Sequence, residues 1–384
     1  MNGGLTLPET IRLFPDSYAG SRARFRAGVE LVRRRWPAAS LESHALSCAP
    51  ELSIDWIAAE AQQQPRRLVC LTTGQHGLEG YVGSAILQLF MEEYLGRLEP
   101  ADTGLLLVHI INPWGMQHGW RTNAHNVDLN RNFVWEAGEF ERDANPDYER
   151  LDAWLNPRRP VRHLGLENAR FALGSVLRLL RWGARRVQVA ALLGQRRFPQ
   201  GIYYGGSAVE EEPAIMMKLY RHWFGAYEKI VMLDIHSGYG PALQMSMVLS
   251  PLQPASSEAL ARKYRYPRVI KTTSSAFYPI QGDMTDWVYR LAQAEFSNKA
   301  LFAAAFEFGT LGDSLLAGYD SLRRTVQGNQ LRHHGARDER TRRRVWEAYR
   351  GLFLRDDQPW RAKCLADARA AFDGILVAEG YVEG

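Results

Sequence analysis

Four short apolar runs stand out along the chain, each bounded by polar residues or glycine. They span Leu68 to Thr73, Leu105 to Ile111, Ile230 to Ile235 and Leu301 to Phe308. Each run is too short for an ordinary helix and has the unbroken apolar character of a strand that is buried on both faces. The pattern therefore predicts four buried strands.

A helix is predicted between the first two strands. After Gly74-Gln75-His76-Gly77, the segment from Gly80 to Leu98 carries apolar residues at helical spacing, namely Val82, Ile86, Leu89, Phe90 and Leu95. Strand, glycine-rich turn, helix and strand in that order are typical of a layered α/β domain. We expect a three-layer α/β/α fold with a mixed, mainly parallel central sheet, in which ligands bind at the carboxyl ends of the strands.

Two further regions have helical patterns but no recognisable chemistry. Residues from about 134 to 224 are rich in arginine and are interpreted as a helical insertion. Residues from about 313 to 384 are interpreted as a helical C-terminal extension. The chain has no internal repeat and no low-complexity linker. We therefore expect one catalytic domain over residues 1–384, with its core motifs between residues 68 and 312.

Composition narrows the function classes. The chain has 384 residues, 46% of them hydrophobic and 23% charged, and a net charge of +5, which is ordinary for a globular protein. Its basic charge is too weak and too scattered to predict a nucleic-acid partner. The arginine-rich insert could touch anionic membranes, but we favour a solvated helical face, and without an 18-residue apolar run no membrane partner is expected. Without a visible signal peptide, we expect a cytoplasmic location.

Metal-binding residue types follow two of the predicted strands. His76 and Glu79 come after the first strand, and His236 comes at the end of the third. Two histidines and one carboxylate are what a catalytic zinc needs, because its fourth position stays open for water. Taken alone, the H-x-x-E spacing favours a hydrogen-bonded turn histidine beside a solvated glutamate, and the matching position of His236 strengthens the metal interpretation. The three cysteines are too few and too scattered for a cysteine zinc site.

Further candidate residues follow the second and fourth strands. Asn130 and Arg131 offer an amide and a forked cation that suit a carboxylate, although an asparagine-rich turn with a solvated arginine gives the same pattern. Asp128 could orient a metal-bound imidazole. Glu307 lies between phenylalanines at the end of the fourth strand, where a carboxylate is costly to bury. It is a candidate general base or, alternatively, an inward glutamate paired with one arginine.

The order of these motifs resembles that of the zinc carboxypeptidase superfamily, which includes aspartoacylase and succinylglutamate desuccinylase. The motifs are H-x-x-E, N-P-x-G, W-R, D-x-N-R-N-aromatic, D-I-H-S and F-E-F, between about Leu68 and Gly312. The likeness is greatest to an uncharacterised bacterial branch of that superfamily, whose insertion motif resembles the segment from Gly194 to Gly206.

The resemblance implies a role for each matching residue. His76, Glu79 and His236 would bind one zinc ion per chain, with Asp128 bracing His76. The remaining matches are Glu307 as general base and acid, Arg121 as the oxyanion-stabilising cation, Asn130 and Arg131 as the substrate-carboxylate site, and Tyr289 as the phenol that caps the substrate.

The resemblance also implies a reaction. We expect a zinc-dependent hydrolase that cleaves an amide bond next to a carboxylate in small peptides. One alternative is a deacylase of N-acyl amino acids, which would not need Tyr289. A lower alternative is a binding protein that keeps the fold without turnover. The expected partner is the small substrate, and the insertion leaves self-association open.

Overall fold

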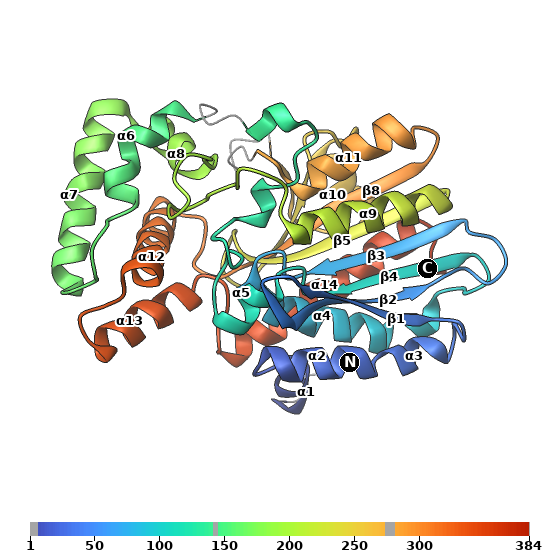
Figure 1. The fold of residues 1–384 in the computed structure, drawn as a ribbon. Helices are drawn as coiled ribbons and strands as arrows, with labels where there is room; N and C mark the ends of the chain where they lie inside the picture. Colours follow the sequence, from blue (N-terminus) through green and yellow to red (C-terminus); the bar gives the residue numbers. More distant parts are fainter. Residues whose placement is uncertain (1–6, 141–144, 273–280, 384) are drawn as a thin grey trace.

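The protein is built around a mixed eight-stranded sheet with helices on both faces (Figure 1). The structure is a computed structural model that describes residues 7–140, 145–272 and 281–383. The strand order across the sheet is β1-β2-β4-β3-β5-β8-β6-β7. The strands are β1 (Ser40–Leu46), β2 (Ala49–Ala59), β3 (Arg67–Thr73), β4 (Thr103–His109), β5 (Lys229–Gly238), β6 (Met245–Leu249), β7 (Val269–Lys271) and β8 (Ala300–Gly309).

The four predicted strands form the centre of this sheet. They are β3, β4, β5 and β8, and each pairs in parallel with its neighbour among them. The antiparallel pairs lie further out, where β1 meets β2, β2 meets β4, and β6 meets β8. The predicted α/β fold with a mixed, mainly parallel sheet is confirmed.

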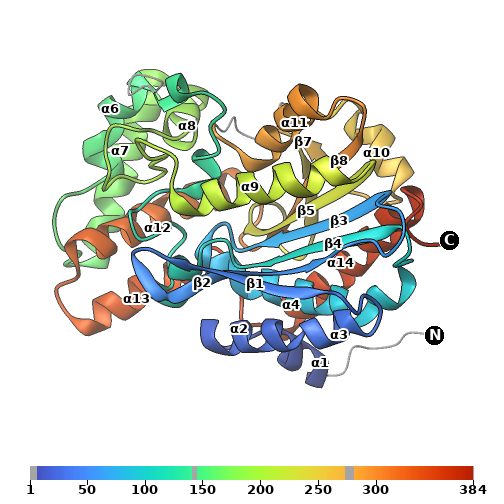
Figure 2. The same ribbon diagram turned by 45° about the vertical axis from the view of Figure 1, so that its right-hand side comes forward.

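Two helical layers cover the sheet, as Figures 1 and 2 show. One face packs against α4 (Gly80–Glu93), α14 (Gln358–Ala378), α10 (Ser257–Lys263) and the N-terminal helices α1 (Leu7–Leu13), α2 (Tyr18–Ala27) and α3 (Val29–Arg33). The other packs against α9 (Glu211–Ala226) and α11 (Met284–Glu295). Although α9 falls within the range predicted as an insertion, it belongs to this second layer.

The central strands are apolar throughout because both of their faces are covered. Along β5, Val231 and Leu233 pack towards α4 and α14, whereas Ile230 and Met232 pack towards α9 and α11. Side chains alternate between the faces of a strand. His236, two residues beyond Asp234, therefore lies on the α9 and α11 face at the carboxyl end of β5.

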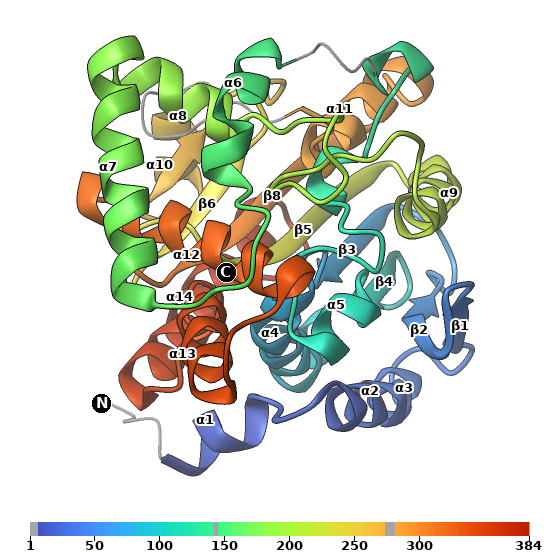
Figure 3. The ribbon, with the colours of Figure 1, turned by 60° about the vertical axis from the view of Figure 1, so that its left-hand side comes forward.

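A separate helical region stands beyond the carboxyl ends of the parallel strands (Figure 3). It contains α6 (Pro146–Leu155), α7 (Leu164–Trp182) and α8 (Ala184–Leu192), followed far along the chain by α12 (Leu315–His334) and α13 (Glu339–Arg350). Its small core joins Trp154, Phe171 and Val187 to Val326 of α12. Part of the insertion therefore packs against the C-terminal extension and not against the sheet.

The C-terminal extension is helical, as predicted, but it is not peripheral. Phe372 and Ile375 of α14 are fully buried in the main core, against the same face of the sheet as α4. Among the described residues, no helix has the length and apolar character needed to cross a bilayer.

Candidate metal centre and active site

Three predicted ligands meet at one point at the carboxyl edge of the sheet. His76 follows β3 and precedes the short 3-10 helix η1 (Gly77–Glu79), whose last residue is Glu79. His236 lies near the end of β5, which pairs with β3. One potential ligand atom from each side chain lies within 4.8 Å of the others, and all three residues are buried.

The two histidines present the same ring nitrogen to the centre. His76 Nδ1 lies 2.9 Å from Glu79 Oε1, and His236 Nδ1 lies 3.0 Å from Glu79 Oε2. The Nε2 atoms point outward, His76 towards Asp128 Oδ1 at 3.0 Å and His236 towards Asp234. A carboxylate that accepts the Nε2 proton leaves the Nδ1 lone pair free, which is how protein metal ligands are commonly oriented.

Several opposite charges keep the acids of the centre ionised despite their burial. Burial opposes ionisation of Asp128, but Arg121, Arg131 and His76 outweigh it and hold the pKa of this carboxyl well below its usual range. For Glu79, His76 and His236 likewise outweigh burial and lower the pKa. Burial also disfavours the charged form of His236, yet Asp234 and Glu79 raise its pKa well above the ordinary value.

A close backbone contact explains how Arg121 reaches the centre. A Cβ atom on Gly77 would lie 2.1 Å from the carbonyl carbon of Gly115, so only glycine fits at this position. The η1 turn then bonds to the following loop, with Gly77 N donating to Arg121 O at 3.0 Å and Leu78 N donating to Trp120 O at 3.2 Å.

The Arg121 guanidinium faces the predicted ligands, as its predicted role requires. Its Nε donates to Asp128 Oδ2 at 3.2 Å, and one terminal nitrogen lies 3.4 Å from Glu79 Oε1. The other terminal nitrogen lies 2.7 Å from His76 Nε2. The side chain keeps 15% of its surface exposed, so it can still reach a ligand.

Glu307 lies on the neighbouring strand, beside the three candidate metal ligands His76, Glu79 and His236, which we call the metal group. It is the register partner of His236 in the parallel pair of β5 and β8, and it stays partly exposed. Loss of solvation raises the pKa of Glu307 to about 7, with a further contribution from Glu79 and opposing ones from His236, His76 and Arg121. A carboxyl group with such a pKa can take up and return a proton near neutral pH.

Asn130 and Arg131 lie in the same network but are already engaged. The amide of Asn130 donates to Asp283 Oδ2 at 3.0 Å, and its oxygen accepts from Met284 N at 3.1 Å. The guanidinium of Arg131, only 1% exposed, bonds to Asp128 and to the carbonyl of Leu192. Its Nε is buried and has no hydrogen-bond partner within the described residues.

The structure does not bring Tyr289 to the centre, and its assignment as a capping phenol is wrong. Tyr289 is 4% exposed and belongs to the core between α11 and the sheet. Its hydroxyl donates to the Ala303 carbonyl at 3.2 Å and accepts from the Gln253 amide at 2.7 Å. The phenol is thus held inside the protein by polar groups in the middle of β8 and near β6.

Sequence reasoning missed two residues that contact the site. Asp234 binds His236, and the D-x-H spacing on a strand, which places both side chains on one face, could have revealed it. Tyr203 stacks on Arg131, with 4.5 Å from the guanidinium carbon to the ring centroid, and lies 5.8 Å from that of Arg121. Its φ of +53° is unusual for an aromatic residue, and nothing in the sequence signals it.

The donor set fits zinc. Two imidazole nitrogens and one carboxylate oxygen are zinc donors that leave a fourth position open, and one such atom from each of the three residues lies within 4.8 Å of the others. His76, Glu79 and His236 would hold the ion, and Asp128 and Asp234 would orient the two imidazoles.

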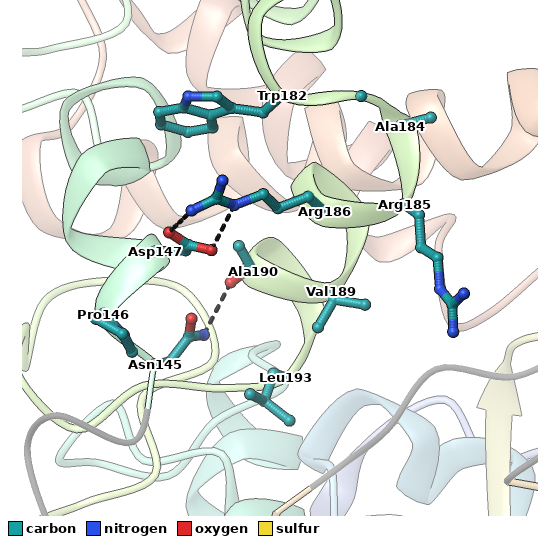
Figure 4. A pocket seen from close by; sticks show the side chains of 11 residues that line it. Asn145, Pro146, Asp147, Trp182, Ala184, Arg185, Arg186, Val189, Ala190 and Leu193 are labelled. Atoms are coloured by element: carbon teal, nitrogen blue, oxygen red, sulfur yellow. Dashed lines mark hydrogen bonds and ion pairs between the residues drawn. The ribbon is translucent and has the colours of Figure 1, made fainter.

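Two cavities among the described residues lie away from this group. The larger, of about 670 Å³, lies between α6 and α8, where Asp147 binds Arg186 through both carboxylate oxygens (Figure 4). The smaller, of about 440 Å³, includes Asp283 and Asp286 in its lining. Neither lining contains a residue of the metal group.

Several solved structures resemble the fold only distantly. Bovine thrombin-activatable fibrinolysis inhibitor, in complex with a tick carboxypeptidase inhibitor, is 15% identical, and the match covers 87% of this chain and 95% of that one with a TM-score of 0.46. Carboxypeptidase A of Helicoverpa armigera is 14% identical, and the match covers 87% of this chain and 73% of that one with a TM-score of 0.46. Succinylglutamate desuccinylase of Chromobacterium violaceum is 13% identical, and the match covers 79% of this chain and 73% of that one with a TM-score of 0.37.

At these TM-scores the function has to be argued from the site itself. Among curated proteins, none matches the chain. One family model matches almost the whole sequence, over residues 14–367, and its description is "protein of unknown function". The chain therefore belongs to the DUF2817 family.

Proposed function

We propose that the protein is a zinc-dependent hydrolase that cleaves an amide bond next to a substrate carboxylate, as a carboxypeptidase does on small peptides. One observation carries this proposal. Two histidine Nδ1 atoms and Glu79 converge, each imidazole is oriented by a buried aspartate, and Glu307 lies beside His236 on the next strand.

The protein's own residues divide the chemical work. A zinc ion bound by His76, Glu79 and His236 would supply a Lewis acid and an activated water. Glu307 would take a proton from the attacking water and return it to the leaving nitrogen. Arg121, whose guanidinium faces the centre, would donate to the oxygen that becomes negative, a contribution of about 3 kcal/mol for one such donor.

Carboxylate recognition would fall to Arg131. Arg131 carries the right charge, and it is linked to the metal group through Asp128. Binding would use the unpartnered Nε of Arg131 or would exchange the Leu192 carbonyl for the substrate. A preference for peptides with a free carboxylate over the same peptides amidated, lost in Arg131→Gln, is expected; equal rates on both would remove this role from Arg131.

The test of the reaction is turnover of the zinc-loaded protein on dipeptides and N-acyl amino acids. Glu307→Gln should keep the metal and lose activity by ~10²–10⁴-fold. Glu295→Gln, which removes the same charge at an exposed position on α11, should leave the rate unchanged. Full activity of Glu307→Gln would overturn the assignment.

The alternative substrate class is an N-acyl amino acid. The position of Tyr289 favours this alternative, because the phenol that would have pointed to a peptidase lies in the core. Faster turnover of N-acyl amino acids than of dipeptides would decide for a deacylase. A metal-loaded protein that hydrolyses neither class would favour a binding protein on the same fold.

A further inference from the structure

Exposed aliphatic side chains are concentrated on one helix. Twelve large hydrophobic residues are exposed among the described parts of the chain, and six of them lie on α7. Two more, Leu315 and Leu316, lie at the start of α12 and are 93% and 80% exposed. Single exposed leucines are normal on a protein surface, but a contiguous group of this size calls for an explanation.

The exposed residues of α7 form a continuous stripe. Leu166, Leu173, Val176, Leu177 and Leu180 recur at intervals that return to one side of a helix, over a length of about 21 Å. We call these five residues the α7 stripe. The opposite side of the helix is buried, with Phe171 in the core of the helical region. The solvated polar face expected for these arginine-rich helices is therefore not what α7 presents.

The start of α12 extends the apolar surface. Tyr319 of α12 contacts Phe171 of α7 with their ring centroids 5.4 Å apart, and Arg323 bonds to Asn168 at 2.9 Å. Gln327 of α12 also donates to Asn168 at 2.8 Å, so α12 crosses α7 close to Asn168 and Phe171. Leu315 and Leu316 lie one turn before Tyr319, at the start of α12. Figure 3 shows α7 at the outer edge of the molecule, with α12 behind it.

Basic charge is concentrated in the segment that contains the α7 stripe. Residues 145–192 contain nine arginines and four acidic residues, so this segment alone has the +5 net charge of the whole chain. Arg162, Arg181 and Arg185 are exposed and form no ion pair within the described residues. Arg185 projects from α8 away from the Asp147–Arg186 pair in Figure 4. Arg170 and Arg181 lie on one flank of the stripe, eleven residues or three turns apart.

We propose that the α7 stripe and its arginines dock onto an anionic lipid surface. An amphipathic helix with leucines on one side and arginines beside them lies in the plane of a membrane interface, where its apolar side chains enter the acyl region and its cations meet phosphate groups. A second copy of the chain fits less well. In a symmetric dimer, two segments that each carry a net charge of +5 would face each other and repel. The stripe itself also offers no polar group that could form a hydrogen bond across an interface.

The test is co-sedimentation with lipid vesicles at low and high salt. The wild-type chain should bind vesicles that contain phosphatidylglycerol and not vesicles of phosphatidylcholine alone, with weaker binding at high salt. Leu173→Gln/Leu177→Gln/Leu180→Gln should abolish binding. Arg181→Glu/Arg185→Glu should weaken it by ~25-fold or more, because each basic residue near an anionic surface contributes about fivefold.

A matched control separates local from general charge effects. Arg343→Glu/Arg344→Glu makes the same charge change at exposed positions on α13 and should alter binding far less than the α8-side pair. Unchanged circular dichroism and metal content would show that the variants are folded. No binding of the wild type to anionic vesicles would overturn the proposal. So would a dimer in analytical ultracentrifugation that the leucine variant dissociates, since the stripe would then belong to a second copy.

Discussion

Asp128 at the metal centre and Glu212 at the start of α9 are both buried acids, yet their pKa values shift in opposite directions. Asp128 is 0% exposed, and three cationic or ionisable partners lower its pKa. Glu212 is 3% exposed and accepts from the Asn123 amide, with 3.3 Å to each carboxylate oxygen, while His125 favours its charged form. Burial, with Glu210 nearby, raises the pKa of Glu212 to about 7. The neighbours, and not burial alone, therefore decide which buried acid stays ionised and can support a metal ligand.

The largest expected effect comes from removing the charge of Asp128. Asp128→Asn leaves the buried Arg131 without its carboxylate partner, and breaking such a buried pair costs about 3–5 kcal/mol of unfolding free energy. Metal affinity should fall by ~10–100-fold, because His76 loses its orienting group. Chemical denaturation and metal titration measure the two effects.

A matched aspartate tests whether the network matters. Asp152 binds Arg158, whose side chain is 59% exposed. Asp152→Asn should cost less than about 1 kcal/mol. Equal losses of unfolding free energy in Asp128→Asn and Asp152→Asn would contradict the claim that the network around Asp128 is the more stabilising of the two.

At Glu212 we expect removal of the charge to stabilise the protein, whereas at Asp128 it should destabilise it. Because the folded pKa of Glu212 is raised to about 7 from an ordinary 4.5, its full contribution to stability is present below pH ~4.5 and is lost as the pH rises through about 7. Glu212→Gln should therefore change little at pH ~4.5 and stabilise the protein by up to about 3 kcal/mol at pH ~8.5. Urea unfolding at the two pH values measures the difference.

The neighbouring Glu211 provides the control for that experiment. Burial opposes its ionisation, but His44 and Ser47 outweigh it and lower the pKa of Glu211. Glu211→Gln should thus lose stability above pH ~4.5, by less than about 1 kcal/mol because the pair is partly exposed. A stability gain in Glu211→Gln, or none in Glu212→Gln, would refute the comparison.

The smallest effect is expected at Tyr203, which stacks on Arg131 and holds it against Asp128. Tyr203→Leu removes the aromatic face and should cost about 1 kcal/mol of stability. Tyr203→Phe keeps that face and should cost less. Thermal unfolding distinguishes the two variants, and equal losses would assign the effect to the hydroxyl group.

The sequence allowed the centre of the fold and much of the site to be predicted for the same physical reason. Parallel strands covered on both faces are apolar along their whole length, so polar residues at their ends, such as His76, His236 and Glu307, stand out. The edge strand β1 lacks this signal because it is partly exposed.

Features set by contacts between distant segments could not be predicted in this way. A tyrosine on an amphipathic helix has the same sequence pattern whether its hydroxyl faces solvent or a backbone carbonyl. The role of Tyr289, whose hydroxyl bonds to Ala303, was therefore mistaken. The outer face of α7 is a similar case. Helical spacing predicts the helix, but which of its two apolar sides is covered depends on α6 and α12.

Metal content of the purified chain after zinc is offered tests the central claim most directly. The wild type and Tyr289→Phe, whose changed residue lies in the core, should each bind one zinc ion per chain, and His236→Ala should bind none. A wild-type chain without stoichiometric zinc, or a His236→Ala variant that retains it, would contradict the assignment of His76, Glu79 and His236 as the metal site.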